Sequence, residues 1–209
     1  NSSRCPNKHV RPMSGTTLID ECLEKVNRLS QIKTAYLATG DDELIEKLSS
    51  YPNVKHLSRS PESYAKGQVK FSVAFEHYSR VNSDYVMIIN PCQPLVDFQV
   101  YQDAVDWFKN CEHDGAVSVI KERNYFFNEN GTIANFNPQS RLCSVSGPSM
   151  LKCTHTFMVF KREFFDKNGT LWPNVNGNPF PVEIPNLNLQ DVDTEEDFLV
   201  ISNILKERK

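Results

Sequence analysis

No apolar run in the 209-residue sequence approaches the roughly 18 residues that a bilayer span needs, so we expect no membrane-spanning helix. The chain also lacks an excess of positive charge: its formal net charge is -3, and no local basic patch stands out. A nucleic-acid partner would require such a patch. With 39% hydrophobic and 23% charged residues, the composition is typical of one soluble globular domain.

Cysteine pairs and the commonest catalytic motifs are missing as well. The six cysteines are scattered, with no C-x-x-C pair and no histidines at zinc spacing. This distribution favours reduced thiols in a cytoplasmic protein over a disulfide framework or a zinc site. The sequence contains no G-x-x-x-x-G-K-[ST], G-x-G-x-x-G, H-E-x-x-H or G-x-S-x-G motif, so four familiar enzyme signatures are absent.

Apolar residues recur with the period of a helix and of a buried strand, in an alternating order along the chain. The stretch 84–89 is near-continuously apolar, as expected for a central parallel strand covered on both faces. The alternation predicts an α/β fold with a doubly wound, mostly parallel sheet in a three-layer α/β/α arrangement. Helices are predicted at 16–29, 43–48, 69–79, 100–110 and 198–205, and strands at 34–39, 84–89, 115–120 and 156–160.

Two stretches, residues 121–153 and 169–188, lack either period and contain prolines and glycines. Long irregular segments are uncommon in a compact domain unless they serve a function. We therefore expect both to be insertions beside a site, within a single domain that covers residues 1–209.

The N-terminal segment is the first candidate site. Ligands of doubly wound sheets bind beyond the carboxyl ends of the strands, and here Ser2, Ser3, Arg4 and Lys8 precede the first predicted helix. Lys8 could neutralise phosphate oxygens as a point charge, and the planar guanidinium of Arg4 could bind two oxygens at once. A basic N-terminal segment is more often a solvated tail, so both interpretations stay open.

A pair of carboxylates, Asp191 and Asp193, precedes the last predicted helix. At i and i+2 in an extended segment the two side chains point the same way and could jointly hold one Mg²⁺. The alternative is helix capping, because acidic groups at a helix N-terminus interact favourably with its dipole. We favour capping for Thr194 and Glu195 and leave both interpretations open for the two aspartates.

Polar residues also lie next to three predicted strands. Asp41 follows the strand at 34–39 and could either contact a ligand or cap the next helix. Asn90 and Gln93 follow the strand at 84–89 and can donate and accept hydrogen bonds, which suits a polar ligand. His155 precedes the strand at 156–160 and could contact a ligand, although a lone histidine is more often structural.

Taken in this order, the segments resemble the acylneuraminate (CMP-sialic acid) cytidylyltransferases and the related CMP-Kdo synthetases over nearly the whole chain. Residues 2–9, SSRCPNKH, resemble the second half of the family's first loop. Residues 39–42 (TGDD), 59–61 (RSP) and 89–96 (INPCQPLV) resemble later segments. The most specific match is 191–198, DVDTEEDF, which resembles the family's Asp-Ile-Asp with a following Asp-Phe.

The resemblance implies a Rossmann-like nucleotidyltransferase that joins CTP to a sialic acid-like ulosonic acid and releases pyrophosphate. It implies that Lys8 and Arg4 act on the phosphates and that Asp191 and Asp193 hold Mg²⁺, these four being the catalytic residues. It implies a homodimer formed through residues 121–153. The implied nucleotide-binding residues are Ser2, Ser3, Arg4, Lys8, His9, Arg59 and Asp41, and the implied acceptor-binding residues are Asn90, Gln93 and His155.

The sequence departs from the family pattern mainly on the acceptor side. Asn90 replaces a glutamine, Val96 an arginine, His9 an asparagine, and Thr154-His155 an Asn-Gly or Asn-Ala pair. The family's first strand would lie before Asn1, and we expect it to precede the sequence given, because a missing central strand would expose its neighbour's edge. The departures leave open another sugar or alcohol acceptor, or a non-catalytic nucleotide-binding regulatory protein of the same fold.

Overall fold

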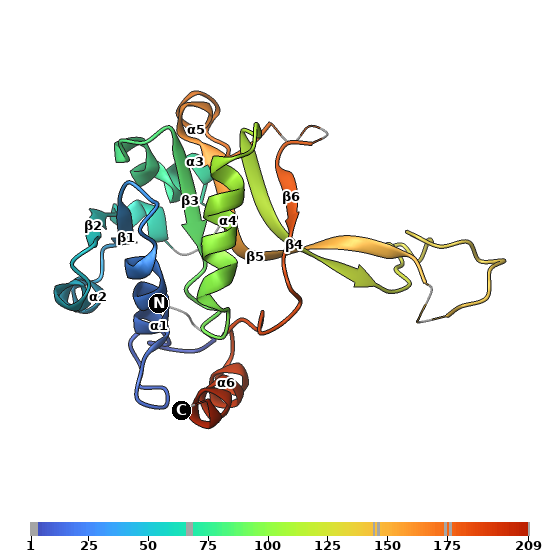
Figure 1. Cartoon of the computed structure of the whole chain (residues 1–209), viewed down its shortest axis with the longest axis horizontal. Coiled ribbons are helices and arrows are strands. Elements are labelled where there is room, and N and C mark those ends of the chain that lie inside the picture. Colours follow the sequence, from blue (N-terminus) through green and yellow to red (C-terminus); the bar gives the residue numbers. More distant parts are fainter. Residues whose placement is uncertain are drawn as a thin grey trace.

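Helices and strands alternate along the chain, as predicted (Figure 1). The structure is a computed structural model that describes residues 4–65, 69–143, 145, 147–173, 175 and 177–208. Across that part of the chain, no helix has the length and apolar character to cross a bilayer. The elements are α1 (Leu18–Arg28), β1 (Ala35–Thr39), α2 (Asp42–Glu46), η1 (Lys47–Ser50), β2 (Val54–Ser58), η2 (Pro61–Tyr64), α3 (Phe71–Ala74), η3 (Glu76–Arg80), β3 (Tyr85–Ile89), α4 (Phe98–Lys109), β4 (Gly115–Arg123), β5 (Ser149–Lys161), α5 (Arg162–Asn168), β6 (Phe180–Glu183) and α6 (Glu195–Glu207).

The strands form two sheets, and within each sheet most strands point in the same direction. β1 and β2 pair in parallel, and the other four strands lie in the order β3-β5-β4-β6. Both β3 and β4 are antiparallel to β5, whereas β6 is parallel to β4. β5 is therefore the one strand of the larger sheet that runs against the others, and the predicted mostly parallel α/β class is confirmed.

Helices cover both faces of the larger sheet. Successive side chains of a strand point to opposite faces, so neighbouring residues of β3 pack against different helices. Val86 and Ile88 of β3 pack in one cluster with Tyr78 of η3 and Phe165 of α5. Met87, between them, packs in another cluster with residues of α4, the helix that crosses in front of the strands in Figure 1. This alternation gives the three predicted layers and explains why β3 is apolar throughout.

A cavity of about 1300 Å³ lies between the two sheets. Apolar residues of β1, β3 and α1 line most of it, among them Leu37, Met87 and Leu23. Among the described residues β1 pairs only with β2 and β3 only with β5, so a strand at the edge of each sheet lines the cavity. Lys8 and His9 also line it, which gives the cavity a polar part beside the N-terminal segment.

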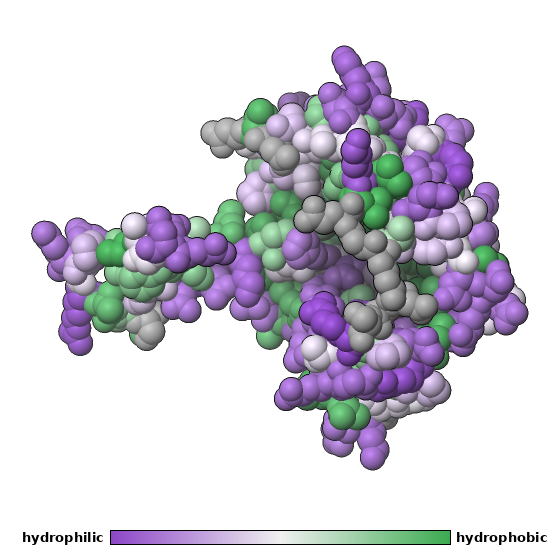
Figure 2. All heavy atoms as spheres, turned by 180° about the vertical axis from the view of Figure 1, so that it is seen from behind, coloured by the Kyte–Doolittle hydropathy of each residue, from purple (hydrophilic) through white to green (hydrophobic). Residues whose placement is uncertain are grey.

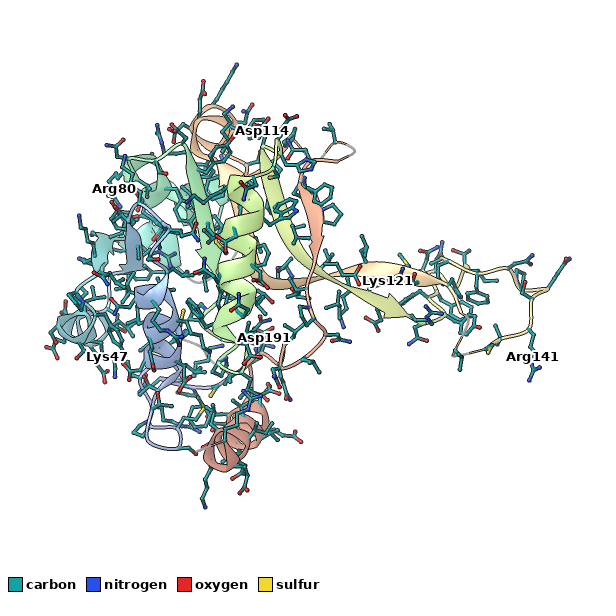
Figure 3. All side chains as sticks on the ribbon, in the orientation of Figure 1. Lys47, Arg80, Asp114, Lys121, Arg141 and Asp191 are labelled. Carbon is teal, nitrogen blue, oxygen red and sulfur yellow. The ribbon has the colours of Figure 1, made fainter. Side chains whose placement is uncertain are left out.

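The prediction that residues 121–153 are irregular is partly wrong. β4 continues to Arg123 and β5 begins at Ser149, and the two strands pair along this length. Together with the described residues between them they project from the body as an arm, with Lys121 near its base and Arg141 near its tip (Figure 3). The strands of the arm pair through the backbone and are largely exposed, so their side chains need not alternate between apolar and polar.

Further local details differ from the prediction. The helix expected at 69–79 is divided into α3 and η3. β2 was not predicted, and β6 lies inside the stretch 169–188 that was expected to be irregular. β6 contains Pro181 and ends the strand order, which is where a sheet tolerates a proline.

We expect buried His77 to make the free energy of unfolding depend on pH. Its side chain is 2% exposed, its Nδ1 atom has no hydrogen-bond partner among the described residues, and burial, with Arg59 nearby, lowers its pKa to about 4. The unfolded state then binds more protons between pH 6.5 and 4, so stability should fall as the pH drops through that range.

We expect urea unfolding to show a smaller loss of free energy between pH 7 and 4.5 for His77→Phe than for the parent chain. Phenylalanine retains an aromatic ring against Phe75 and Tyr78 but cannot be protonated. Identical pH dependence in the two proteins would show that His77 does not contribute.

Candidate functional site

Three segments that are distant in sequence meet around Val192. Its backbone N–H donates to the carbonyl of Cys92 at 2.9 Å, and its carbonyl accepts from Lys8 Nζ at 2.5 Å. The Val192 side chain is fully buried in a cluster with Cys5 and Leu95. Val192 therefore anchors the two flanking aspartates beside the N-terminal segment and the loop after β3; Figure 3 marks Asp191 near the lower end of α4.

Asp193 is paired with both predicted cations. Arg4 Nη2 lies 3.2 Å from Asp193 Oδ2, and Lys8 Nζ lies 3.4 Å from Asp193 Oδ1. The Lys8 side chain is 8% exposed and that of Arg4 66%. The structure thus brings together three of the four predicted catalytic residues, with one ammonium held in a fixed, buried place.

Asp191 has a different environment. Asn90 Nδ2 donates to its Oδ1 atom at 2.8 Å, and Gln93 Nε2 donates to its Oδ2 atom at 3.0 Å. Two of the predicted acceptor-binding residues therefore contact the fourth predicted catalytic residue. Neutral amides orient this carboxylate without cancelling its charge, whereas Asp193 is compensated by two cations.

A capping box at the start of α6 fixes the backbone position of Asp193. Thr194 Oγ1 accepts from the backbone N–H of Asp197 at 3.2 Å, and Asp197 Oδ2 accepts from that of Thr194 at 2.8 Å. The same carboxylate accepts from the backbone N–H of Asp193 at 3.1 Å, and the bonds from Thr194 lower the pKa of Asp197. The capping interpretation of Thr194 is confirmed, and Glu195 forms an ion pair with Arg11 at 2.8 Å.

His9, Arg59 and Asp41, also predicted to bind the nucleotide, line the cavity that Lys8 lines. Burial, followed by the positive charge of Lys8, lowers the pKa of His9 to about 4, so its imidazole is neutral at pH 7. Arg59 is held by backbone carbonyls, donating to Ser63 O at 2.8 Å and to Ala74 O at 3.3 Å. His9 therefore lines the cavity as a neutral group, and Arg59 lines it with a guanidinium whose position is fixed.

Asp41 has a clear local role. Its Oδ1 atom accepts from the backbone N–H of Glu43 at 3.1 Å and caps α2, the alternative that the sequence left open. It also lines the cavity, so capping and ligand contact are compatible. Ser2 and Ser3, also predicted to bind the nucleotide, lie outside the described residues.

His155 lies on an irregular part of β5 beside the loop after β3. The register changes from Val117↔Met158 to Val119↔Cys153, and His155 has φ +55°. A positive φ is uncommon for residues other than glycine, although histidine, like asparagine and aspartate, adopts it more often than most, and such conformations cluster at functional sites. Its neighbours Thr154 and Thr156 are buried, so the bulge directs the exposed His155 outward next to the site.

Sequence reasoning missed the hydroxyl network that holds this bulge. Thr154 Oγ1 donates to Ser118 Oγ at 2.8 Å, Thr156 Oγ1 donates to Thr154 Oγ1 at 3.0 Å, and Ser118 Oγ accepts from the backbone N–H of Phe157 at 3.1 Å. All three hydroxyl residues are buried. Polar residues inside otherwise apolar strands are the only signal that could have pointed to them.

Cys92 has the loop position of a reactive thiol, but its environment does not activate it. Burial raises the pKa of Cys92 in spite of the neighbouring Lys8, which lowers it. A thiol with a raised pKa is mostly protonated near neutral pH and is a poor nucleophile. The chemistry of the site therefore depends on its carboxylates and cations.

Carboxylates such as those of Asp191 and Asp193 are of the chemical type that holds a magnesium ion together with a phosphate ligand. In the part of the chain that the structure describes, no three His, Cys, Asp or Glu side chains gather into a metal site. Magnesium is commonly held by only one or two carboxylates together with waters and substrate phosphates. Asp191, whose oxygens accept from two neutral amides, and Asp193, which follows at i+2, have the chemistry of such donors.

Known proteins of similar sequence are bacterial cytidylyltransferases. The chain is 24% identical over 118 residues to 3-deoxy-manno-octulosonate cytidylyltransferase 2 of Hydrogenovibrio crunogenus, a match that covers 56% of this chain and 47% of that protein. It is 26% identical over 118 residues to 8-amino-3,8-dideoxy-manno-octulosonate cytidylyltransferase of Shewanella baltica, covering 56% and 46%. The matches thus span about half the length of these relatives.

Solved structures share the fold at low sequence identity. CMP:2-keto-3-deoxy-manno-octonic acid synthetase complexed with CTP superposes with a TM-score of 0.70 and 12% identity, covering 100% of this chain and 95% of that one. 4-Diphosphocytidyl-2C-methyl-D-erythritol synthase from Anaerococcus prevotii superposes with a TM-score of 0.64 and 14% identity, covering 93% and 88%. The family model described as "Cytidylyltransferase" matches residues 1–165. The chain belongs to this cytidylyltransferase family.

Proposed function

We propose that the chain transfers a cytidylyl group from CTP to an ulosonic acid of the Kdo type and releases pyrophosphate. The observation that carries the proposal is the meeting of Arg4 and Lys8 with Asp193, two residues from Asp191, with Lys8 also lining the cavity. Cations and carboxylates at one place suit a substrate that carries phosphates. The family and the names of the relatives support CTP and an eight-carbon acceptor.

Positioning and charge neutralisation supply most of the catalysis. Lys8, buried and aimed from the N-terminal segment, would neutralise phosphate oxygens, and the more exposed Arg4 would bind two of them. A hydroxyl of the acceptor attacks the α-phosphorus and loses its proton to solvent, the bond from that phosphorus to the bridging oxygen breaks, and pyrophosphate leaves with the electron pair. Such a step asks the protein to align two reactants and to stabilise developing charge.

Magnesium is part of the proposal. Asp191 and Asp193 would hold it, and when bound it would supply positive charge at the phosphate oxygens. On the nucleotide side, His9, Arg59 and Asp41 would contact the base or ribose, as the family resemblance implies. Ser2 and Ser3 would join them from the start of the chain.

The acceptor would lie beside the β5 bulge. We assign His155 to acceptor contact, since it is exposed and lies between two threonines that bond to the loop after β3. Sialic acid is a second acceptor to test. A different alcohol is a third, because the fold is shared with 4-diphosphocytidyl-2C-methyl-D-erythritol synthase.

Base choice can be measured separately from acceptor choice. Isothermal titration of the chain with CTP, UTP, ATP and GTP in the presence of Mg²⁺ should show tightest binding for CTP. Equal affinity for the four nucleotides would contradict the proposed function.

We include a homodimer formed through the arm, residues 121–153. Apolar side chains gather on it (Figure 2), and several are largely exposed: Phe127, Leu142, Val145, Met150 and Leu151. Exposed apolar groups on a projecting segment are typical of an interaction surface. A cytoplasmic location is also proposed, supported by the free thiols of Cys22, Cys92, Cys111 and Cys153.

Leu142→Asp should shift a dimer toward monomer in sedimentation velocity, because it places a charge on the arm's apolar surface. Leu199→Asp is a matched control: Leu142 is 61% and Leu199 60% exposed, but Leu199 lies on α6. A parent chain that sediments as a monomer, or equal effects of the two substitutions, would contradict the arm as the dimer interface.

A further inference from the structure

Both oxygens of Asp191 are held by carboxamides from one short loop. Asn90 and Gln93 are three residues apart after β3, and their side chains donate to Oδ1 at 2.8 Å and to Oδ2 at 3.0 Å. A carboxylate oxygen has about two acceptor positions. One donor on each oxygen therefore fixes the orientation of the carboxylate and leaves acceptor positions open for a cation.

Gln93 is not placed to touch a substrate. It is 2% exposed, and its Nε2 atom also donates to Thr154 O at 2.8 Å, so both amide hydrogens have partners. Its Oε1 atom is buried and accepts no hydrogen bond from the described residues. Leaving such an acceptor unsatisfied is unfavourable, which indicates that the donor side of the amide is what the position requires.

Asn90 is similarly engaged on both sides of its amide. Its Oδ1 atom accepts from the backbone N–H of Cys92 at 2.9 Å while its Nδ2 atom donates to Asp191. Its own backbone N–H donates to Thr156 O at 3.1 Å. A side chain with both ends fixed is a poor candidate for acceptor recognition.

The hydrogen bonds that hold Asn90 and Gln93 extend into β5. The carbonyls of Thr154 and Thr156 that accept from Gln93 and Asn90 belong to the bulge, and the buried hydroxyls of Ser118, Thr154 and Thr156 hold that bulge. A continuous set of hydrogen bonds thus runs from β4 through β5 and the loop after β3 to Asp191.

Resting on the proposed function, we propose that Gln93 and Asn90 are positioning residues that hold the Asp191 carboxylate for its cation, and do not bind the acceptor. Neutral donors suit this task, because they orient the carboxylate and preserve its full negative charge. Groups that orient a metal ligand typically change metal affinity or activity 10–100-fold when they are removed.

The test is the affinity for Mn²⁺, a paramagnetic substitute for Mg²⁺, measured by electron paramagnetic resonance with CTP present. Gln93→Met retains the length of the side chain without the donor and should weaken Mn²⁺ binding about 10–100-fold. Its acceptor KM should change little. Gln102→Met is the matched control, since Gln102 Nε2 donates to a carboxylate on α4, Asp106 Oδ2, at 3.1 Å; it should bind Mn²⁺ like the parent.

A double-mutant cycle separates positioning from a general structural effect. Adding Gln93→Met to Asp191→Asn should cause no further loss of Mn²⁺ affinity, because the group on which Gln93 acts is already changed. Unchanged Mn²⁺ affinity in Gln93→Met, together with a raised acceptor KM, would overturn the positioning role. A parent chain that binds Mn²⁺ but releases no pyrophosphate would instead refute the proposed function.

Discussion

Replacing Lys8 with methionine is expected to lower kcat/KM for CTP by about 100-fold or more, the usual effect of removing one fixed donor to a charged transition state. Lys8 is the only buried cation in contact with Asp193 among the described residues, and two oxygens fix its ammonium group, Val192 O and Asp193 Oδ1. An ammonium held in advance needs no reorganisation when phosphate arrives. Steady-state pyrophosphate release measures the effect.

The control for this variant is Lys47→Met. Lys47 also forms an ion pair, with Asp20 at 2.6 Å, but Figure 3 shows it on the far side of α1 from Asp191. It should leave kcat/KM within a few-fold of the parent. Equal kinetics for Lys8→Met and Lys47→Met would remove Lys8 from the phosphate site.

Asp191→Asn and Asp193→Asn should each abolish measurable turnover while leaving the fold intact. Asparagine has nearly the shape of aspartate, so packing around the buried Val192 is preserved. The negative charge that a cation needs is lost, and at position 191 an amide nitrogen would face Asn90 Nδ2 or Gln93 Nε2. Pyrophosphate release and thermal unfolding, measured on the same samples, separate the two effects.

Asp114→Asn provides the comparison, because Asp114 forms an ion pair with Lys161 at 3.5 Å and Figure 3 marks it at the opposite end of the body from Asp191. It should retain parental turnover. Turnover within a few-fold of the parent for Asp191→Asn or Asp193→Asn would refute the metal assignment of that residue.

Local patterns in the sequence predicted the helices and strands with strong periodicity. β3 was visible because both of its faces are buried, and the capping of α6 by Thr194 was visible because the capping residues are adjacent in sequence. β6 and the arm were missed, since their pairing depends on distant strands and leaves little apolar pattern. The division of the helix at 69–79 into α3 and η3 was missed as well.

The candidate site shows the same contrast between local and distant information. Motif order predicted that Arg4, Lys8, Asp191 and Asp193 act together, and the structure pairs Arg4 and Lys8 with Asp193, whereas Asp191 accepts from Asn90. Motif order could not predict that Asn90 and Gln93 donate to Asp191, because 101 and 98 residues separate these pairs. The bulge that carries His155 depends on hydroxyls from β4 and β5, which no short window contains.

The central claim, cytidylyl transfer to an ulosonic acid, is tested most directly by pyrophosphate release from CTP and Mg²⁺ with a panel of acceptors. The panel should contain Kdo, 8-amino-3,8-dideoxy-manno-octulosonate and sialic acid, each also run with Asp191→Asn. We predict release that depends on one of the eight-carbon acids and is absent from the variant. No release with any acceptor, from a parent chain that binds CTP, would contradict the account and favour a non-catalytic nucleotide-binding protein.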